Sequence, residues 1–206
     1  GEFKNKIAII GGGPAGLSCA YYLALTGYRP IVFEKNEKPG GMLTYGIPSY
    51  KLEKDVVEAE IDIIRALGVE IKCGVEVGKD ITLDELRKDG YEAFYIAIGC
   101  QGSRKSGVDG EDADGVMSAV DILHEIAENH DLDLKGNKTV VIGGGNVAVD
   151  VARSTKRCGA DVLGMFCLES REEMPASEEE IFETEDEGIQ INNGWGVKEI
   201  LEENGK

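Results

Sequence analysis

Short apolar runs alternate with amphipathic stretches along this chain, a pattern typical of parallel α/β architecture. Residues 7–10 and 30–34 predict two strands, and residues 14–26 between them predict a helix that ends at Gly27. A strand, a helix and a second parallel strand make a right-handed βαβ unit. The order recurs in a second predicted unit: a strand around Val140, a helix over 145–158 and a strand over 161–168.

The stretch between the two βαβ units carries further predicted elements. Thr82 and Glu85 form a capping box that starts a short helix. Residues 103–115 are rich in Gly, Asp and Ser, and we interpret them as the passage between two lobes. The remaining elements are a helix over 52–67, a strand over 69–73, a strand over 93–98 that ends at Gly99, and a helix over 116–128.

The last residues predict a hairpin that the sequence does not complete. Residues 197–201 have the pattern of a strand, and Asn204-Gly205 is a strong two-residue hairpin signal, yet the sequence stops at Lys206. We therefore expect the chain to be a piece of a longer protein. Upstream, Ser177 and Glu180 predict a capping box at the start of an acidic helix.

A glycine-rich turn, residues 11–16, joins the first predicted strand to the first helix. Its G-x-G-x-x-G pattern in this context is typical of a dinucleotide site, because Gly11 permits the tight turn, Gly13 lets a pyrophosphate approach, and Gly16 lets helix and strand pack closely. The amides and the dipole at the helix N-terminus stabilise the phosphates. Glu34, eighteen positions after Gly16, is placed to hold a ribose diol.

The second βαβ unit carries a turn of the same design, with Gly143, Gly145 and Ala148 in the three roles. Glu169, near the end of its second strand, is interpreted as the counterpart of Glu34. A carboxylate there accepts hydrogen bonds from the ribose of NAD and repels the extra phosphate of NADP, so we predict a preference for NADH. Arg171, two residues on, works against that preference by reaching toward a 2′-phosphate. Two dinucleotides in one chain predict electron transfer between them.

Composition excludes several other classes of function. The formal net charge of −17 argues against nucleic acid as a partner, because the chain would displace few counterions from a phosphate backbone. No run of eighteen apolar residues is present, so we expect no membrane span. The five cysteines are dispersed and there is no secretion signal, which favours the cytoplasm, and with two histidines no metal site is predicted.

Six motifs follow one another over nearly the whole chain: residues 9–17, 33–35, 40–48, 97–99, 143–150 and 171–176. Together they resemble the small subunit of glutamate synthase and the flavin-containing part of dihydropyrimidine dehydrogenase. The resemblance implies FAD in the first site and NAD(P)H in the second, with hydride passing from nicotinamide to flavin. Electrons then pass through iron–sulfur clusters to a partner subunit or domain of the synthase or dehydrogenase type.

The resemblance also implies which residues contact each cofactor. It assigns no acid–base residue, because the protein's task is to position two stacked rings. The implied FAD contacts are Gly11, Gly12, Gly13, Pro14, Ala15, Gly16, Glu34, Lys35, Gly40, Gly41, Met42, Leu43, Lys51, Val77 and Gly99. The implied NAD(H) contacts are Gly143, Gly144, Gly145, Asn146, Val147, Ala148, Glu169 and Arg171.

The sequence departs from the family pattern in three places. Members that use NADPH carry a basic pair where this chain has Leu168-Glu169, which agrees with a preference for NADH. The cysteine-rich segment that precedes the first glycine turn in the family is absent, and so is the closing part of the FAD domain. We therefore predict two Rossmann-like dinucleotide-binding domains, both incomplete at the C-terminal end: an FAD part over 1–107, a connection with a helix over 108–136, and an NAD(P) part over 137–206.

Two alternatives stay open from the sequence. A disulfide reductase similar to thioredoxin reductase also pairs two dinucleotide folds, but it needs two neighbouring cysteines beside the flavin, and no close pair exists here. The second alternative is a nucleotide-binding fragment without turnover, for which we expect weak retention of FAD.

Overall fold

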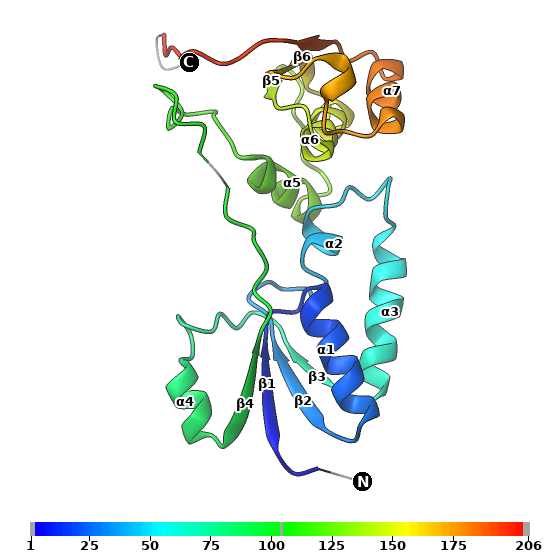
Figure 1. The fold of residues 1–206 in the computed structure, drawn as a ribbon, viewed down its shortest axis with the longest axis vertical. Coiled ribbons are helices and arrows are strands. Elements are labelled where there is room, and N and C mark those ends of the chain that lie inside the picture. Colours follow the sequence, from blue (N-terminus) through cyan, green and yellow to red (C-terminus); the bar gives the residue numbers. More distant parts are fainter. Residues whose placement is uncertain (1–2, 104, 204–206) are drawn as a thin grey trace. The chain divides into compact units, whose positions relative to one another are not determined.

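The computed structural model describes residues 3–103 and 105–203, which form two compact units divided between Cys100 and Gln101. Each unit is a parallel β-sheet with helices packed against it, as the alternating pattern predicts (Figure 1). Within the described residues, no helix has the length and apolar character that crossing a membrane requires.

The first unit contains a four-stranded parallel sheet in the order β3–β2–β1–β4. Helices α1 and α3 pack against one face of this sheet, and α4 packs against the other (Figure 1). The strands are β1 (Lys6–Ile10), β2 (Arg29–Phe33), β3 (Glu70–Lys72) and β4 (Tyr91–Ile96). The helices are α1 (Pro14–Leu25), α2 (Met42–Tyr45), α3 (Lys54–Ala66) and α4 (Leu83–Lys88).

Strand alternation explains how this sheet buries both of its faces. Ile9 and Val32 point into the core beneath α1, whereas Ala8, Ile10 and Phe33 point into the core beneath α4. A strand that is apolar at consecutive positions is typical of a parallel sheet covered on both sides. Strands β1 and β2 are parallel and Ile10 is paired to Phe33, so their carboxyl ends lie side by side.

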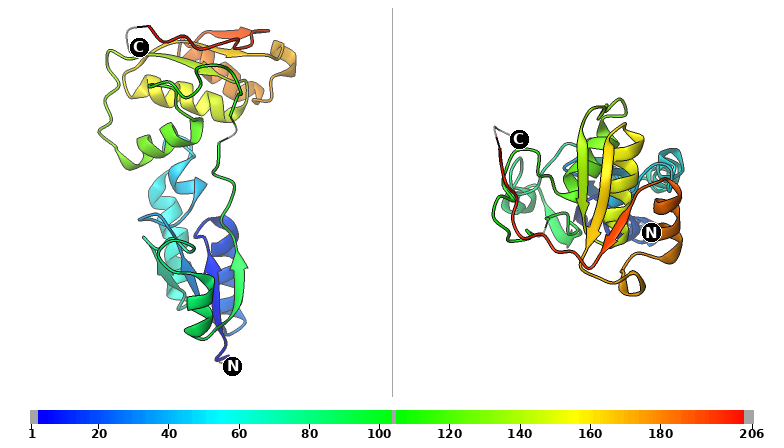
Figure 2. Two further views of the ribbon diagram at one scale, coloured as in Figure 1. Left: turned by 90° about the vertical axis from the view of Figure 1, so that its left-hand side faces the viewer. Right: turned by 90° about the horizontal axis from the view of Figure 1, so that it is seen from above.

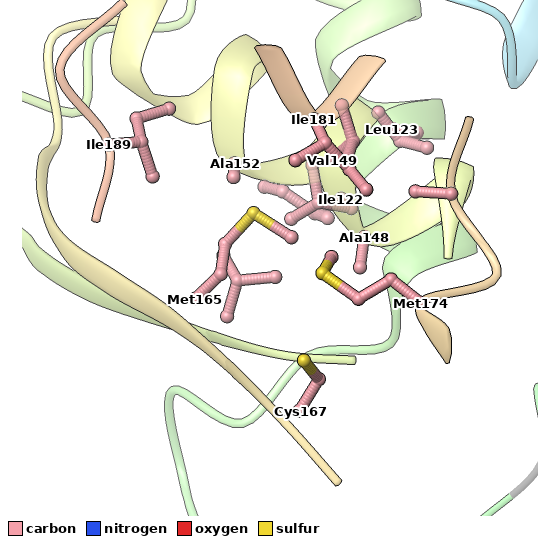
Figure 3. Close-up of a cluster of buried hydrophobic side chains, with 13 residues drawn as sticks. Ile122, Leu123, Ala148, Val149, Ala152, Met165, Cys167, Met174, Ile181 and Ile189 are labelled. Carbon is pink, nitrogen blue, oxygen red and sulfur yellow. The ribbon is translucent and has the colours of Figure 1, made fainter. Parts of the chain in front are cut away.

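The second unit contains a three-stranded parallel sheet in the order β5–β6–β7, seen side by side in the right-hand view of Figure 2. Its core joins the sheet to three helices, and Figure 3 shows side chains from these elements meeting around Val149 of α6. The strands are β5 (Lys138–Ile142), β6 (Asp161–Cys167) and β7 (Ile191–Asn193). The helices are α5 (Ala119–Glu128), α6 (Asn146–Arg157), the 3-10 turn η1 (Arg171–Glu173) and α7 (Glu178–Asp186).

Most predicted elements are confirmed to within a few residues at their ends. The Thr82–Glu85 capping box is present, with both reciprocal hydrogen bonds. The predicted connection over 108–136 includes α5, whose Ile122 and Leu123 lie in the core of the second unit. The division of the chain into FAD and NAD(P) parts remains a prediction.

Three details of the sequence interpretation differ from the structure. The strand predicted over 197–201 is wrong, because Glu199 forms only a single bridge, to Asp109. Strand β7 was not predicted, since its sequence, Ile-Asn-Asn, has no strand-like alternation. The capping box at Ser177 is half formed: the Ser177 hydroxyl accepts from the Glu180 amide, but the reciprocal bond from the Ser177 amide to the Glu180 side chain is not formed. The predicted turn at 204–205 lies outside the described residues.

A buried arginine attaches the acidic helix α7 to α6. Arg153 is only 5% exposed, and its Nε donates to Glu187 Oε1 at 2.8 Å. Its Nη1 also contacts the carboxylates of Glu183 and Glu180, so Glu180 faces Arg153 rather than completing the capping box. Arg157 Nη2 donates to the same Glu187 oxygen at 2.7 Å. The negative charge of α7 is therefore partly neutralised by α6.

We predict that Arg153→Met destabilises the protein by about 1–3 kcal/mol at neutral pH, between the values typical of exposed and of fully buried pairs, because the glutamates remain partly exposed. Burial raises the pKa of Glu187, but hydrogen bonds from Arg157 and Arg153 outweigh it and leave that pKa below 4.5. A carboxyl group whose pKa is lower in the folded than in the unfolded state stabilises the fold at any pH above its unfolded-state pKa. This contribution is lost as the pH falls through the folded-state pKa.

Chemical denaturation at neutral pH and at about pH 3.5 checks this linkage. The difference between wild type and Arg153→Met is expected to shrink at the acid pH. Arg87→Met, which removes an exposed pair with Asp84 on α4, is the control and is expected to cost less than about 1 kcal/mol. A difference that stays constant with pH would show that the α6–α7 ion pairs do not stabilise the fold.

Candidate functional site

The first glycine turn connects β1 to α1 and is held by close backbone packing. The Gly11 amide donates to the Phe33 carbonyl at 2.8 Å, and Gly11 has a φ of +107°. A Cβ atom on Gly11 would collide with the carbonyl oxygen of Ala97, and one on Gly16 would collide with the carbonyl oxygen of Gly11. Both positions therefore require glycine, as the pattern predicts.

Glu34 lies directly against the middle of this turn. It follows β2 and is 5% exposed, and its Oε2 accepts from the Gly12 amide at 2.7 Å. Its Oε1 accepts from the Asn36 amide at 2.8 Å. A buried carboxylate needs such donors, and here the backbone supplies them. The structure thus brings together the predicted acid and the predicted turn.

A second glycine-rich segment crosses the first turn. The Gly40 amide donates to the Gly12 carbonyl at 2.7 Å. Gly41 has a φ of +56°, and a Cβ on it would lie 2.9 Å from Gly13 Cα. The two backbones approach this closely because Gly41 carries no side chain. A ligand at the turn would therefore touch both segments.

Lys54 fixes the segment that follows, and it is not among the site residues that the sequence predicts. Its Nζ donates to the carbonyl oxygens of Leu43, at 2.8 Å, and Ile47. Burial lowers the pKa of the Lys54 amine. A lysine in the first turn of a helix opposes the helix dipole, so this position was the signal that Lys54 has a specific partner.

The other predicted FAD residues differ in how exposed they are. Lys35 is exposed, Val77 is half-buried and bridges Ile81, and Gly99 has a φ of +69° with open space where a Cβ would lie. Pro14 and Ala15 begin α1 and are exposed. Met42 is exposed, and Leu43 and Lys51 are half-buried.

The second glycine turn, between β5 and α6, repeats the first in its hydrogen bonds. The Gly143 amide donates to the Phe166 carbonyl at 2.9 Å, as Gly11 does to Phe33. The Ala176 amide donates to the Gly144 carbonyl at 3.0 Å, as Gly40 does to Gly12. In both units the middle glycine thus accepts a hydrogen bond from a segment beyond the second strand. We call residues 39–41 and 175–177 the crossing segments.

Strand register corrects one assignment in the second unit. Ile142 pairs with Phe166 in the second unit, as Ile10 pairs with Phe33 in the first. The position equivalent to Glu34 is therefore Cys167 and not Glu169. The Glu169 carboxylate nevertheless reaches the equivalent place, because a Cβ on Gly144 would lie 3.1 Å from Glu169 Oε2. The matching distance in the first unit, from Gly12 to Glu34 Oε2, is 3.0 Å. Glu169 follows the position equivalent to Glu34 by two residues, and the path of the backbone after β6 brings its carboxylate to the same place beside the turn.

The remaining predicted residues of the second site divide between the turn and its crossing segment. Asn146 Oδ1 accepts from the Ser177 amide at 3.0 Å, so this side chain holds the crossing segment. Ala148 is buried beside Gly143, whereas Val147 is 51% exposed. Arg171 is exposed, and its Nη2 pairs with Glu185 Oε2 at 2.9 Å. In the structure, Arg171 therefore contacts α7.

The two turns leave room where a pyrophosphate would bind. A Cβ on Gly145 would meet no atom within 4 Å, and one on Gly13 would meet only Gly41 Cα, at 3.8 Å. Their φ angles, −96° and −77°, are accessible to any residue. Glycine at these two positions is thus not required by the fold. The residues present fit a dinucleotide, whose pyrophosphate approaches a helix N-terminus where no side chain intervenes.

The cysteines do not form a reactive dithiol in the described part of the chain. All five thiols are free. Burial is the main cause that raises the pKa of Cys19, Cys73, Cys158 and Cys167, and a reactive thiol needs a lowered pKa instead. This arrangement disfavours dithiol chemistry of the thioredoxin reductase type.

A comparison with protein-family models identifies the chain. The model described as "Pyridine nucleotide-disulphide oxidoreductase" matches residues 5–206. The chain belongs to this family. Its fold is accordingly that of the FAD- and NAD(P)-dependent oxidoreductases, with a Rossmann-like arrangement around each glycine turn.

Named relatives in this oxidoreductase family are much longer than the chain. It is 46% identical over 187 residues to the NADP(+)-dependent formate dehydrogenase subunit beta of Moorella thermoacetica, covering 90% of this chain and 26% of that protein. It is 37% identical over 197 residues to the glutamate synthase [NADPH] small chain of Escherichia coli, covering 91% and 42%. The chain thus spans between a quarter and a half of these relatives.

A solved structure shares the fold. FprA of Mycobacterium tuberculosis, determined in complex with NADPH, superposes with a TM-score of 0.72 at 24% sequence identity, covering 88% of this chain and 47% of that one.

We predict that Gly13→Ala and Gly145→Ala fold normally but bind dinucleotides poorly. An alanine at an accessible φ leaves the stability unchanged or raises it by about 0.4–1 kcal/mol. The new methyl group occupies the path of the pyrophosphate, so we expect affinity to fall by about tenfold or more, for FAD at Gly13 and for the nicotinamide dinucleotide at Gly145. Calorimetric titration and denaturation of the same samples measure both quantities.

Gly102→Ala is the matched control, because a Cβ there also meets nothing within 4 Å and no glycine turn is involved. It is expected to change neither binding constant. Unchanged affinity in Gly13→Ala or Gly145→Ala would mean that the corresponding turn does not hold a pyrophosphate.

Proposed function

We propose that the chain is the dinucleotide-binding part of a flavoprotein oxidoreductase, with FAD at the first turn and a nicotinamide dinucleotide at the second. The repeated geometry supports this proposal most directly. Each turn combines an open glycine, a carboxylate beside the middle glycine, and a crossing segment that donates to that glycine's carbonyl. A glycine turn that served only the fold would not need the open position twice.

The chain's own residues bind and orient the two dinucleotides. At the first turn, the α1 amides would hold the pyrophosphate and Glu34 would accept from the adenosine ribose, while Lys54 holds the 43–47 segment in place. At the second, the α6 amides and Glu169 have the same tasks, and Asn146 keeps the crossing segment closed. FAD, when bound, supplies the redox chemistry by accepting a hydride from the nicotinamide. No side chain has to transfer a proton in that step.

We further propose that the parent protein delivers its electrons to an iron–sulfur partner subunit or domain in the cytoplasm. The names of the relatives support the existence of a partner subunit: one is the beta subunit of a formate dehydrogenase and another the small chain of glutamate synthase. The free cysteines are consistent with a reducing compartment.

Anaerobic mixing of the flavin-loaded parent protein with NADH or NADPH tests the proposed reaction. We expect the visible absorbance of the flavin to disappear as it is reduced. In Gly145→Ala the flavin should remain bound but be reduced much more slowly at low nucleotide concentration. A parent protein that binds flavin and is reduced by neither nucleotide would refute the proposal.

The choice between NADH and NADPH is set by charges around the second turn. The relatives' names favour NADPH. In this chain, however, the Glu169 carboxylate lies beside Gly144, and Arg171 is paired with Glu185. A carboxylate at that place repels a 2′-phosphate and accepts from a free 2′-hydroxyl. We therefore propose that this protein differs from those relatives and prefers NADH.

We predict that Glu169→Arg shifts the preference toward NADPH by about tenfold or more, since reversing a charge near a phosphate changes their interaction by roughly 1–3 kcal/mol. The measurement is the ratio of kcat/KM for NADH to that for NADPH in the parent protein. Glu172→Arg on η1 makes the same change in net charge and should alter the ratio less. A wild-type protein that reacts faster with NADPH would contradict the proposed preference.

A further inference from the structure

Two large apolar side chains are strongly exposed at one edge of the second sheet. Leu168, directly after β6, is 74% exposed, and Trp195, two residues after β7, is 63% exposed. Trp195 is the only tryptophan in the chain. Exposure of these apolar side chains to water is unfavourable, and a flat aromatic ligand that covered them would remove their apolar surface from water.

Backbone hydrogen bonds hold this pair in place. The Trp195 amide donates to the Cys167 carbonyl at 2.9 Å, and Asn193 Nδ2 donates to the Glu169 carbonyl at 3.1 Å. A Cβ on Gly196 would lie 2.9 Å from Leu168 Cδ2, so the backbone of Gly196 lies against Leu168. The residues after β7 thus continue along the end of β6 as an ordered segment. The backbone at Trp195 is consequently held beside the backbone of residues 167–169.

Strand order places the pair next to the ribose acceptor. Along the carboxyl edge of the sheet, the glycine turn follows β5, Glu169 follows β6, and Trp195 follows β7. A dinucleotide with its pyrophosphate at the turn and its adenosine ribose at Glu169 carries its adenine further in the same direction. That direction leads to the end of β7.

The first unit shows that this feature is not required by the fold. There, the Val75 amide donates to the Glu34 carbonyl at 2.9 Å, the bond that corresponds to the one from Trp195 to Cys167. Val75 is half-buried and packs against the core beneath α4. The second unit therefore has an exposed tryptophan where the first has a partly buried valine.

We propose that Trp195 and Leu168 form the adenine-binding surface of the second site, with the indole ring stacked on the base. This inference rests on the proposed function, because it requires a dinucleotide at the second turn. Stacking on an exposed aromatic ring depends on the adenine and not on the nicotinamide end of the ligand. The surface should therefore bind ADP-ribose as well as the intact nicotinamide dinucleotide.

Fluorescence of the unmodified chain provides a first test, because all tryptophan emission comes from residue 195. We expect saturable quenching by ADP-ribose, and no quenching by nicotinamide mononucleotide, which lacks adenine. Binding of ADP-ribose at the first turn is not expected to change this signal. An emission that is unchanged at saturating ADP-ribose would overturn the inference.

Calorimetric titration of the FAD-saturated chain with ADP-ribose tests the energetic contribution. Trp195→Ala should weaken binding by roughly tenfold or more, and Trp195→Phe, which keeps an aromatic surface, should retain most of the affinity. Phe182→Ala removes another exposed aromatic residue, 68% exposed on α7, and should change nothing.

The outcomes separate this inference from the proposed function. If Gly145→Ala loses ADP-ribose binding while Trp195→Ala binds as tightly as wild type, the dinucleotide site stands and the adenine surface is refuted. If Gly145→Ala also binds ADP-ribose at wild-type strength, the second turn is not a dinucleotide site and both proposals fail.

Discussion

The contact between the middle glycine of each turn and an acidic side chain beyond the second strand is the constraint on which the rest depends. In the first unit it is a 2.7 Å hydrogen bond from the Gly12 amide to a carboxylate that is 5% exposed. In the second it is the approach of the Glu169 carboxylate to Gly144. Each contact places a negative acceptor beside an open helix N-terminus, so one end of the site suits hydroxyl groups and the other suits phosphates.

The two units repeat this constraint while differing in how it is supported. The first uses two glycines in its crossing segment and a half-buried lysine, Lys54, behind it. The second uses Asn146 to hold its crossing segment and Arg153 to attach α7, the helix that follows that segment, to α6. A common backbone plan with different supporting side chains is what two different ligands would require, and it agrees with membership of the pyridine nucleotide-disulphide oxidoreductase family.

The sequence predicts most of this architecture because the signals that determine it are local. Strand–glycine–helix patterns fix both turns, and the positions of Gly11 and Gly16 follow from steric contacts that any such turn makes. The sequence does not reveal that Cys167 is in register with Glu34, because register depends on pairing across the sheet. Arg153 and Trp195 escape prediction because their partners lie far away in the chain. Lys54 binds carbonyl groups of the preceding loop, whose path the sequence does not show.

A crystal structure of the parent protein with FAD and a nicotinamide dinucleotide bound would test the central claim most directly. The account predicts one pyrophosphate within hydrogen-bonding distance of the amides that begin α1 and another at those that begin α6. It also predicts an adenosine ribose on Glu34 and on Glu169. A bound dinucleotide whose pyrophosphate lies away from either glycine turn, or whose ribose contacts neither carboxylate, would contradict it.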